Sequence, residues 1–125
     1  MTSYLVVFVG AGIGGALRHG VNVASGRLLG PGFPWGTLIV NVLGSLAMGL
    51  LAAYFVARSG ASEQWRLFLT TGLLGGFTTF SAFSLDTMLL VERNSYGLAA
   101  AYVLLSVGAS IAALFAGLSL FRMGA

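Results

Sequence analysis

The chain has 125 residues, of which 58% are hydrophobic and only 7% are charged, and its net charge at pH 7 is +3. Soluble domains carry about 25% charged residues, so this composition indicates a membrane protein with one domain over residues 1–125. The chain has no cysteine, which excludes disulfides, thiolate metal sites and cysteine nucleophiles. Its positive charge comes from scattered arginines, which form no basic patch for nucleic acid.

Four apolar segments are long enough to cross a bilayer, and we predict an all-α fold with four transmembrane helices. The segments cover about residues 4–23, 36–57, 65–90 and 96–121. The linker GRLLGPGFPWG between the first two contains the turn-forming residues glycine and proline. The first segment begins with MTSYLVVFVG and lacks the basic start of a signal peptide, so we expect it to remain in the mature protein.

The first span contains a pattern that is typical of a different class of protein. Gly10, Gly12 and Gly15 form a GxGxxG sequence, which in soluble proteins indicates a dinucleotide site. That site needs a βαβ unit and an acidic residue about 20 positions later, but the first acidic residue is Glu63. We therefore expect these glycines to allow close helix packing. Other small residues at four-residue spacing favour the same packing: Gly10/Gly14, Gly72/Gly76, Ser106/Ser110 and Ala109/Ala113/Gly117.

Polar residues within the spans are candidates for a functional site, because they are costly in a membrane. Arg18 lies deep in the first span, where it either snorkels or draws anions into a vestibule. Asn41 lies early in the second span, one turn after Thr37, and a common role for such an amide is a bond between helices. In the fourth span, Ser106 and Ser110 lie one turn apart.

The third span has the richest polar set, which follows a glycine pair. Gly75 and Gly76 weaken the helix, and we predict a break near Gly75–Thr79. Phe80 and Phe83 share one helix face, and the positive edges of their rings can attract a small anion. Packing against a neighbouring helix explains any single hydroxyl well, but it explains the whole set less well. The polar residues of this span are Thr70, Thr71, Thr78, Thr79, Ser81, Ser84 and Asp86.

The arginines are almost balanced between the two sides of the membrane. The positive-inside rule therefore gives no clear orientation. Two interpretations stay open: one segment is misplaced, or the chain inserts both ways and pairs as an antiparallel homodimer. The side that holds both termini has Arg58, Arg66 and Arg122, and the other side has Arg27, Arg93 and, if it snorkels there, Arg18.

The few carboxylates restrict the possible functions. Only Asp86 lies within a span, near its end, whereas a proton-coupled exporter normally needs a carboxylate at the membrane centre. No catalytic grouping is recognisable, so we do not expect an enzyme. The remaining hydroxyls, amide and ring edges suit a small, hard anion. Two alternatives stay open, namely a small dual-topology proton-coupled exporter of organic cations and a membrane assembly subunit that transports nothing.

Three motifs resemble those of the fluoride channel family known as Fluc or CrcB, and the resemblance covers nearly the whole chain. They are GGALRHG, GTLIVNVLGS and TTGLLGGFTTFSAFS. The resemblance implies a passive fluoride channel that gives fluoride resistance in a prokaryotic plasma (inner) membrane. It further implies an antiparallel, dual-topology homodimer with two separate pores.

The same resemblance implies roles for individual residues. Arg18 is similar to the family's vestibule arginine, and the backbone carbonyls of Gly75 and Thr78 from both subunits are expected to bind a structural sodium ion on the dimer axis. Three positions depart from the family pattern: Asp86 replaces a glutamate, His19 replaces an aromatic residue, and Leu114 leaves no hydroxyl one turn past Ser110. The residues expected to line each fluoride pore are Asn41, Thr79, Phe80, Ser81, Phe83, Ser84 and Ser110.

Overall fold

The computed structural model describes residues 2–58 and 60–124, and within these ranges its regular structure is helical throughout. Four segments are long and apolar enough to cross a membrane, as predicted. Three are single helices, α1 (Thr2–Leu29), α2 (Trp35–Ala57) and α6 (Tyr96–Gly124). The third, Glu63–Glu92, has four parts: α3 (Glu63–Leu67), the π-helical η1 (Phe68–Leu74), α4 (Gly75–Phe77) and α5 (Phe80–Glu92).

The first helix is longer than we predicted. It continues to Leu29, and the chain then turns at Gly30, whose φ of 81° is readily adopted only by glycine. The predicted end near residue 23 was therefore wrong. A helix readily accommodates the residues that follow Val23, and the first strong stop signal is the glycine and proline pair at 30–31.

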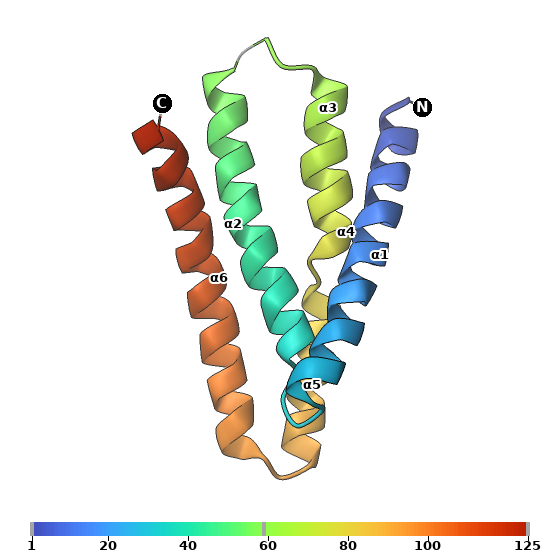
Figure 1. The fold of residues 1–125 in the computed structure, drawn as a ribbon, viewed down its shortest axis with the longest axis vertical. Helices are drawn as coiled ribbons and strands as arrows, with labels where there is room; N and C mark the ends of the chain where they lie inside the picture. The colour runs from blue at the N-terminus through green and yellow to red at the C-terminus, as the bar shows by residue number, and fades with distance from the viewer. Residues whose placement is uncertain (1, 59, 125) are drawn as a thin grey trace.

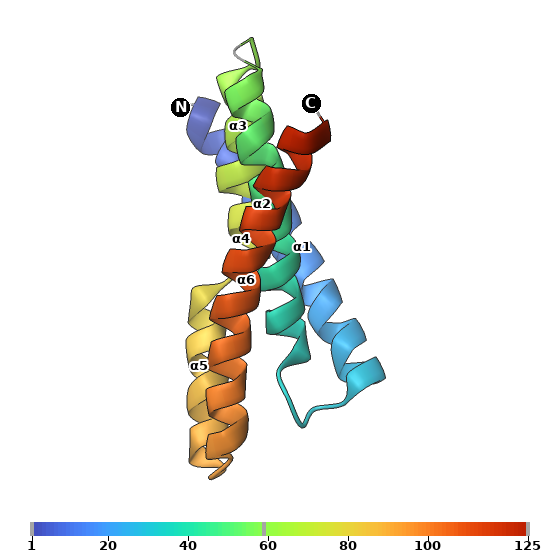
Figure 2. The same ribbon diagram turned by 90° about the vertical axis from the view of Figure 1, so that its left-hand side faces the viewer.

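The helices form a V-shaped bundle in which the chain crosses from end to end four times (Figure 1). Both termini and the α2–α3 connection lie at one end, and the other two connections lie at the opposite end (Figure 1). The view from the side shows α1 splayed away from α5 and α6 at that opposite end (Figure 2). The predicted division of the arginines between the two ends therefore agrees with the path of the chain.

Glycines bring α1 against the third span. A Cβ atom on Gly10 or Gly14 would collide with the backbone of residues 68–77, and one on Gly76 would collide with the backbone of Ala11. The predicted close packing through these glycines is confirmed. A Cβ atom added to Gly12 or Gly15, in contrast, would meet no atom of the described residues within 4 Å. Only Gly10 of the GxGxxG set therefore serves this contact.

A second pair of glycines joins α2 to α6. Added Cβ atoms on Gly49 and Gly117 would meet backbone atoms of the opposite helix, those of Leu114 and Leu46 respectively. Close approach of helices through small residues is a general feature of membrane bundles. It aligns α2 and α6 over much of their length, and this alignment positions the polar side chains of the site described next.

Little of the apolar surface is buried within the single chain. Among the described residues, the buried hydrophobic ones are Val40, Ala53, Leu74, Leu90, Ala99 and Tyr102. Large side chains such as Phe8, Leu104 and Phe115 are 77%, 73% and 69% exposed. A surface this apolar needs lipid or another protein around it.

Candidate functional site

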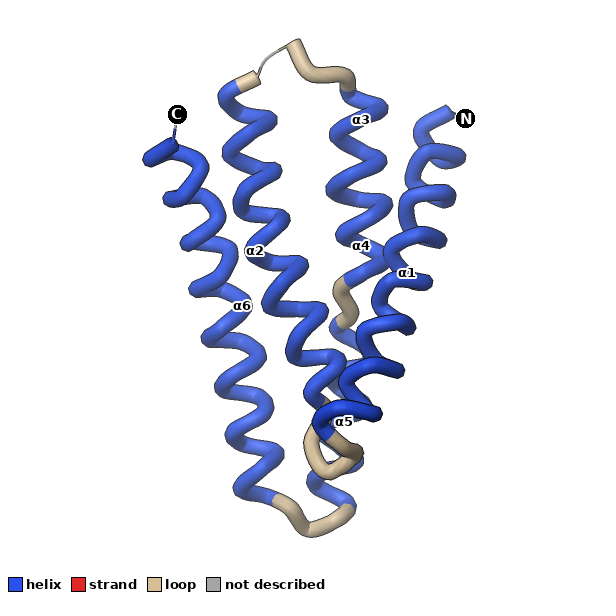
Figure 3. The backbone as a smooth tube through the Cα atoms, viewed as in Figure 1, coloured by secondary structure: helices blue, strands red, loops and turns tan. Residues whose placement is uncertain are grey.

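The third span is interrupted between α4 and α5 (Figure 3). Thr78 and Thr79 both adopt extended backbone conformations, with ψ of 158° and 124°. The interruption lies within the predicted region, but the glycines themselves do not unwind. Gly75 keeps helical angles, and Gly76 lies tightly against α1, where its lack of a side chain permits the contact.

Asn41 of α2 stabilises the extended segment. Its Nδ2 donates a hydrogen bond to the carbonyl of Thr79 (3.0 Å), and its Oδ1 accepts one from the Thr79 backbone N–H (2.8 Å). The hydroxyl of Thr79 caps α5 by accepting from the Ala82 N–H (3.1 Å). A single amide side chain therefore satisfies both backbone groups of the residue at the break.

At the break, two backbone N–H groups bond to side-chain oxygens, whereas in a continuous helix they would bond to backbone carbonyls. In an unbroken α-helix, the N–H of Thr79 would bond to the carbonyl of Gly75, and that of Ala82 to the carbonyl of Thr78. Here these donors bond to Asn41 Oδ1 and Thr79 Oγ1. The carbonyl of Gly76, the residue after Gly75, accepts a hydrogen bond from Arg18 Nε at 3.1 Å. The break thus releases the carbonyls of Gly75 and Thr78 from their helical partners.

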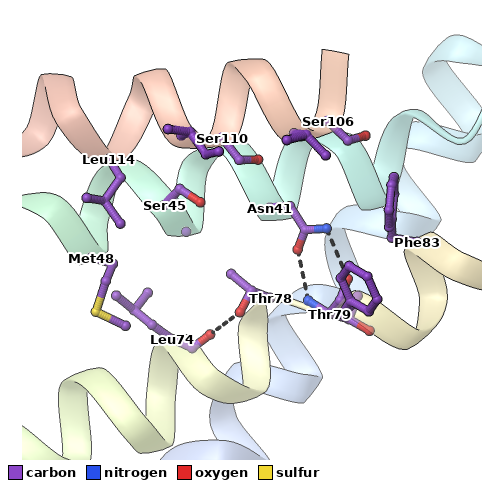
Figure 4. Close-up of a pocket in the computed structure, with 14 residues that line it drawn as sticks. Asn41, Ser45, Met48, Leu74, Thr78, Thr79, Phe83, Ser106, Ser110 and Leu114 are labelled. Carbon is purple, nitrogen blue, oxygen red and sulfur yellow. Dashed lines mark hydrogen bonds between the residues drawn. The ribbon is translucent and has the colours of Figure 1, made fainter. Parts of the chain in front are cut away.

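A cavity of about 400 Å³ lies beside the break, between α2, the third span and α6 (Figure 4). Its lining combines an amide, hydroxyls, two phenylalanine rings and aliphatic side chains, and it contains no charged residue among those described. The lining residues are Asn41, Gly44, Ser45, Met48, Leu74, Thr78, Thr79, Phe80, Phe83, Ser106, Val107, Ser110, Ile111 and Leu114.

Two hydroxyls of this cavity have free hydrogen-bonding capacity. The Oγ atoms of Ser106 and Ser110 are buried and have no hydrogen-bond partner among the described residues. A buried, unpaired polar group is costly, and its presence in a native structure usually has a functional reason. Both hydroxyls lie on one side of α6 next to the cavity (Figure 4), where they can donate to a bound molecule.

A row of aromatic rings leads away from the cavity. The centroid of Phe83 lies 5.5 Å from that of Phe80 and 5.2 Å from that of Tyr102. Phe83 is half-buried, whereas Phe80 is 77% exposed. At the far end of the row, the hydroxyl of the fully buried Tyr102 donates to Asp86 Oδ2 (3.0 Å).

A second cavity, of about 700 Å³, has Asp86 among its lining residues. It lies between the C-terminal half of α1, the loop that follows α1, and α5. Its polar lining residues include Asn22, Ser25, Thr37 and Arg93, and Arg93 Nη2 also donates to the carbonyl of Gly32 (3.1 Å), which ties two loops together. The aromatic row and the Tyr102–Asp86 pair therefore lie between the two cavities.

The structure brings together five of the predicted pore residues: Asn41, Thr79, Phe80, Phe83 and Ser110 line the first cavity. Their functional roles stay predictions.

The other predicted residues lie elsewhere. Ser81 and Ser84 are exposed and do not line the cavity; Ser84 Oγ donates back to the Phe80 carbonyl at 3.1 Å. Arg18 contacts the helix break instead of the cavity. Whether it also serves as the predicted vestibule arginine stays a prediction.

Sequence reasoning missed Ser45 and Tyr102. Each has a signal in the chain: Ser45 lies four residues after Asn41, and Tyr102 lies four residues before Ser106, so both extend a polar helix face that had been recognised.

Comparison with known proteins gives consistent matches along the chain. Residues 5–118 match the family model described as "CrcB-like protein, Camphor Resistance (CrcB)". The chain is 62% identical to the fluoride-specific ion channel FluC of Methylobacterium nodulans, over 98% of each chain. It is 59% identical to the protein of that name from Rhodopseudomonas palustris strain BisB5, over 96% of this chain and 97% of the relative. The corresponding protein of Agrobacterium fabrum is 54% identical over 98% of each chain.

Proposed function

Because the chain belongs to the CrcB-like family, we propose that it forms a fluoride-selective channel through which fluoride leaves a cell passively. The observation that carries this proposal is the first cavity, where the hydroxyls of Ser106 and Ser110 are buried, have no hydrogen-bond partner among residues 2–58 and 60–124, and can donate. Fluoride is a small anion that only accepts hydrogen bonds, so a lining of donors without carboxylates suits it.

The phenylalanine rings supply the second part of the proposed fluoride site. Aromatic edges carry partial positive charge, so Phe80 and Phe83 can stabilise an anion without holding it as tightly as an arginine would. Conduction needs this balance, because an ion that is bound too strongly does not leave. In this proposal fluoride moves along the Ser106 and Ser110 hydroxyls and past the two rings.

A second copy of the chain completes the proposed pore. Three residues that line the cavity, Phe80, Val107 and Ile111, are 77%, 48% and 66% exposed in the single chain. An anion in this cavity would therefore be open to lipid on one side. We propose an antiparallel, dual-topology homodimer with two pores, which agrees with the near balance of arginines at the two ends of the bundle.

We further propose that the dimer holds a structural sodium ion. The carbonyls of Gly75 and Thr78 lose their helical donors at the break, and Gly75 is exposed on the surface of the single chain. Carbonyl groups at membrane depth need partners, and two symmetry-related copies would present four such oxygens to one cation. No acidic side chain occurs in residues 64–85, and this favours a monovalent ion over a divalent one.

Arg18 supports this arrangement from the other side of the break. Its Nε donates to the carbonyl of Gly76, which directly follows the proposed sodium ligand Gly75 in the chain. We propose that the channel lies in the plasma (inner) membrane of a prokaryote, where the inside-negative potential drives fluoride outwards and gives fluoride resistance.

The second candidate is a small proton-coupled exporter of organic cations. It would need a titratable carboxylate at the membrane centre. Glu63 and Glu92 are the end residues of the third span, and Asp86 is already paired with Tyr102 beyond the aromatic row. Flux from liposomes separates the candidates. A fluoride channel releases fluoride when a potassium gradient and valinomycin set the potential, and the exporter instead couples proton and cation movement. Absence of fluoride release from liposomes that contain folded protein would contradict our proposal.

A further inference from the structure

The polar side chains that α2 and α6 contribute to the first cavity stop within one helical turn. Helices α2 and α6 lie side by side and run in the same direction, and the third span faces them across the cavity (Figures 1 and 4). One row of side chains on each helix passes through three successive levels, polar at the first two and apolar at the third, and Val107 and Ile111 line the cavity beside the serines of α6. From α2 these are Asn41, Ser45 and Met48, and from α6 they are Ser106, Ser110 and Leu114.

Leu74 completes the apolar level from the third span. It is buried (7% exposed) and lines the same cavity as Met48 and Leu114 (Figure 4). Its carbonyl already accepts from the backbone N–H of Thr78 (3.0 Å) and from Thr78 Oγ1 (2.9 Å). We call Met48, Leu74 and Leu114 the apolar collar, since three elements each contribute one aliphatic side chain to it.

The row of hydroxyls stops at the apolar collar, whose three aliphatic side chains offer an anion no hydrogen-bond donor. From Ser110 to Leu114 the axial distance is about 6 Å, so an anion that leaves the last hydroxyl reaches aliphatic side chains within one step. A small anion is strongly hydrated, and an apolar wall neither replaces its water molecules nor holds them well. The collar is therefore the part of the path where an anion is stabilised least.

We propose that the apolar collar limits the rate of fluoride passage through this cavity. The inference rests on the proposed function and adds to it the position of the main barrier. In this proposal Met48, Leu74 and Leu114 affect the rate at which fluoride passes. Ser106, Ser110 and the phenylalanine rings bind the ion.

The test is to add a donor to the collar and to measure flux. Leu114→Thr extends the hydroxyl row by one turn, and Met48→Gln places an amide donor on a side chain of similar length. Each is expected to raise the initial rate of fluoride efflux from liposomes about fivefold, since removal of ~1 kcal/mol from a barrier has this effect. Leu120→Thr is the matched control, because Leu120 is 57% exposed on the same helix and lies outside the cavity lining; its flux is expected to stay at the wild-type rate.

Chloride efflux, measured in parallel, distinguishes a lower barrier to fluoride from a general leak caused by looser packing of the protein. A rise in fluoride efflux with chloride at background supports the collar. If both variants elute as the wild type does and neither conducts fluoride faster, the collar is wrong although the channel function stands. A parallel rise in chloride efflux overturns the collar as well. If the folded wild-type protein conducts no fluoride, the proposed function fails, and the collar with it.

Discussion

Asn41 and Thr79 form two reciprocal hydrogen bonds across 38 residues of sequence, with the amide of one side chain bonded to both backbone groups of the other residue at 3.0 and 2.8 Å. This pair fixes the extended conformation at the helix break. Because Thr79 is the N-cap of α5, the pair also ties the start of the helix that carries Phe80 and Phe83 to α2.

Asn41→Asp is expected to abolish fluoride efflux and to lower stability. The carboxylate still accepts from the Thr79 N–H, but it leaves the Thr79 carbonyl without a donor, at a cost of ~1–3 kcal/mol. Its negative charge also repels an anion in the cavity. Thermal unfolding and liposome flux measure the two effects. Gln64→Glu makes the same chemical change on exposed α3 and should alter neither. Wild-type flux in Asn41→Asp would contradict a pore role for this amide.

Phe80→Ile and Phe83→Ile are each expected to reduce fluoride efflux by about tenfold or more, the effect of ~1.4 kcal/mol. Isoleucine keeps the apolar bulk but removes the positive ring edge. Phe83→Ile should also destabilise the fold, because it loses the contact with Tyr102. Phe115→Ile is the control, since Phe115 is 69% exposed on α6 and lies outside the cavity. Unchanged flux in both variants would show that these rings do not face the path.

The adjacent glycines Gly75 and Gly76 are expected to respond differently to alanine. A Cβ on Gly75 meets only the Thr70 carbonyl at 3.7 Å, so the single chain accommodates it. A Cβ on Gly76 collides with the backbone of Ala11, and Gly76→Ala should destabilise the fold by ~1–3 kcal/mol.

Sodium dependence tests the proposed cation. Bound sodium stabilises the folded dimer, so the wild-type unfolding temperature should be higher in sodium than in N-methylglucamine. Gly75→Ala should lose this difference while it keeps its helical content. If the wild type unfolds at the same temperature in both solutions, the sodium site is wrong.

Arg18→Gln is expected to lower stability by ~1.5–3 kcal/mol, the range for a hydrogen bond to a charged group. The loss follows from the bond between Arg18 Nε and the Gly76 carbonyl, and it should also weaken the sodium dependence. Arg27→Gln removes the same charge from an exposed position near the end of α1 and should change stability little. Equal effects of the two substitutions would argue against a specific role for Arg18.

Dual topology predicts that the C-terminus is found on both sides of the membrane. The chain has no cysteine, so Met123→Cys introduces a single thiol at an exposed position. About half of these thiols should react with a membrane-impermeant reagent in intact cells, and the rest only after permeabilisation. Two lysines added near the C-terminus should shift the population to one orientation. Labelling from one side alone in Met123→Cys would exclude the antiparallel dimer.

The sequence by itself determined the features that depend on one helix at a time. Length and composition predicted four spans, and the turn signals placed their connections, because a membrane helix needs a long apolar segment with satisfied backbone groups. Four-residue spacing predicted that Gly10, Gly14, Gly72 and Gly76 lie at close helix contacts, since residues at this spacing lie on one helix face. The structure confirms this and shows that the contact is between α1 and the third span. Each of the three family motifs also lies within one segment of the chain, and together they were sufficient to identify the family.

Only the tertiary structure decided how these faces combine. Within the predicted region Gly75–Thr79, it placed the break at Thr78 and Thr79 and kept the glycine pair helical, because Gly76 is needed for contact with Ala11 and Asn41 provides bonds for Thr79. It also paired Tyr102 with Asp86, and it aligned two polar faces and three apolar side chains around one cavity. These relationships join residues on different helices, and their register depends on how backbones separated by many residues pack together. A pattern within one helix carries no information about the register of its neighbour.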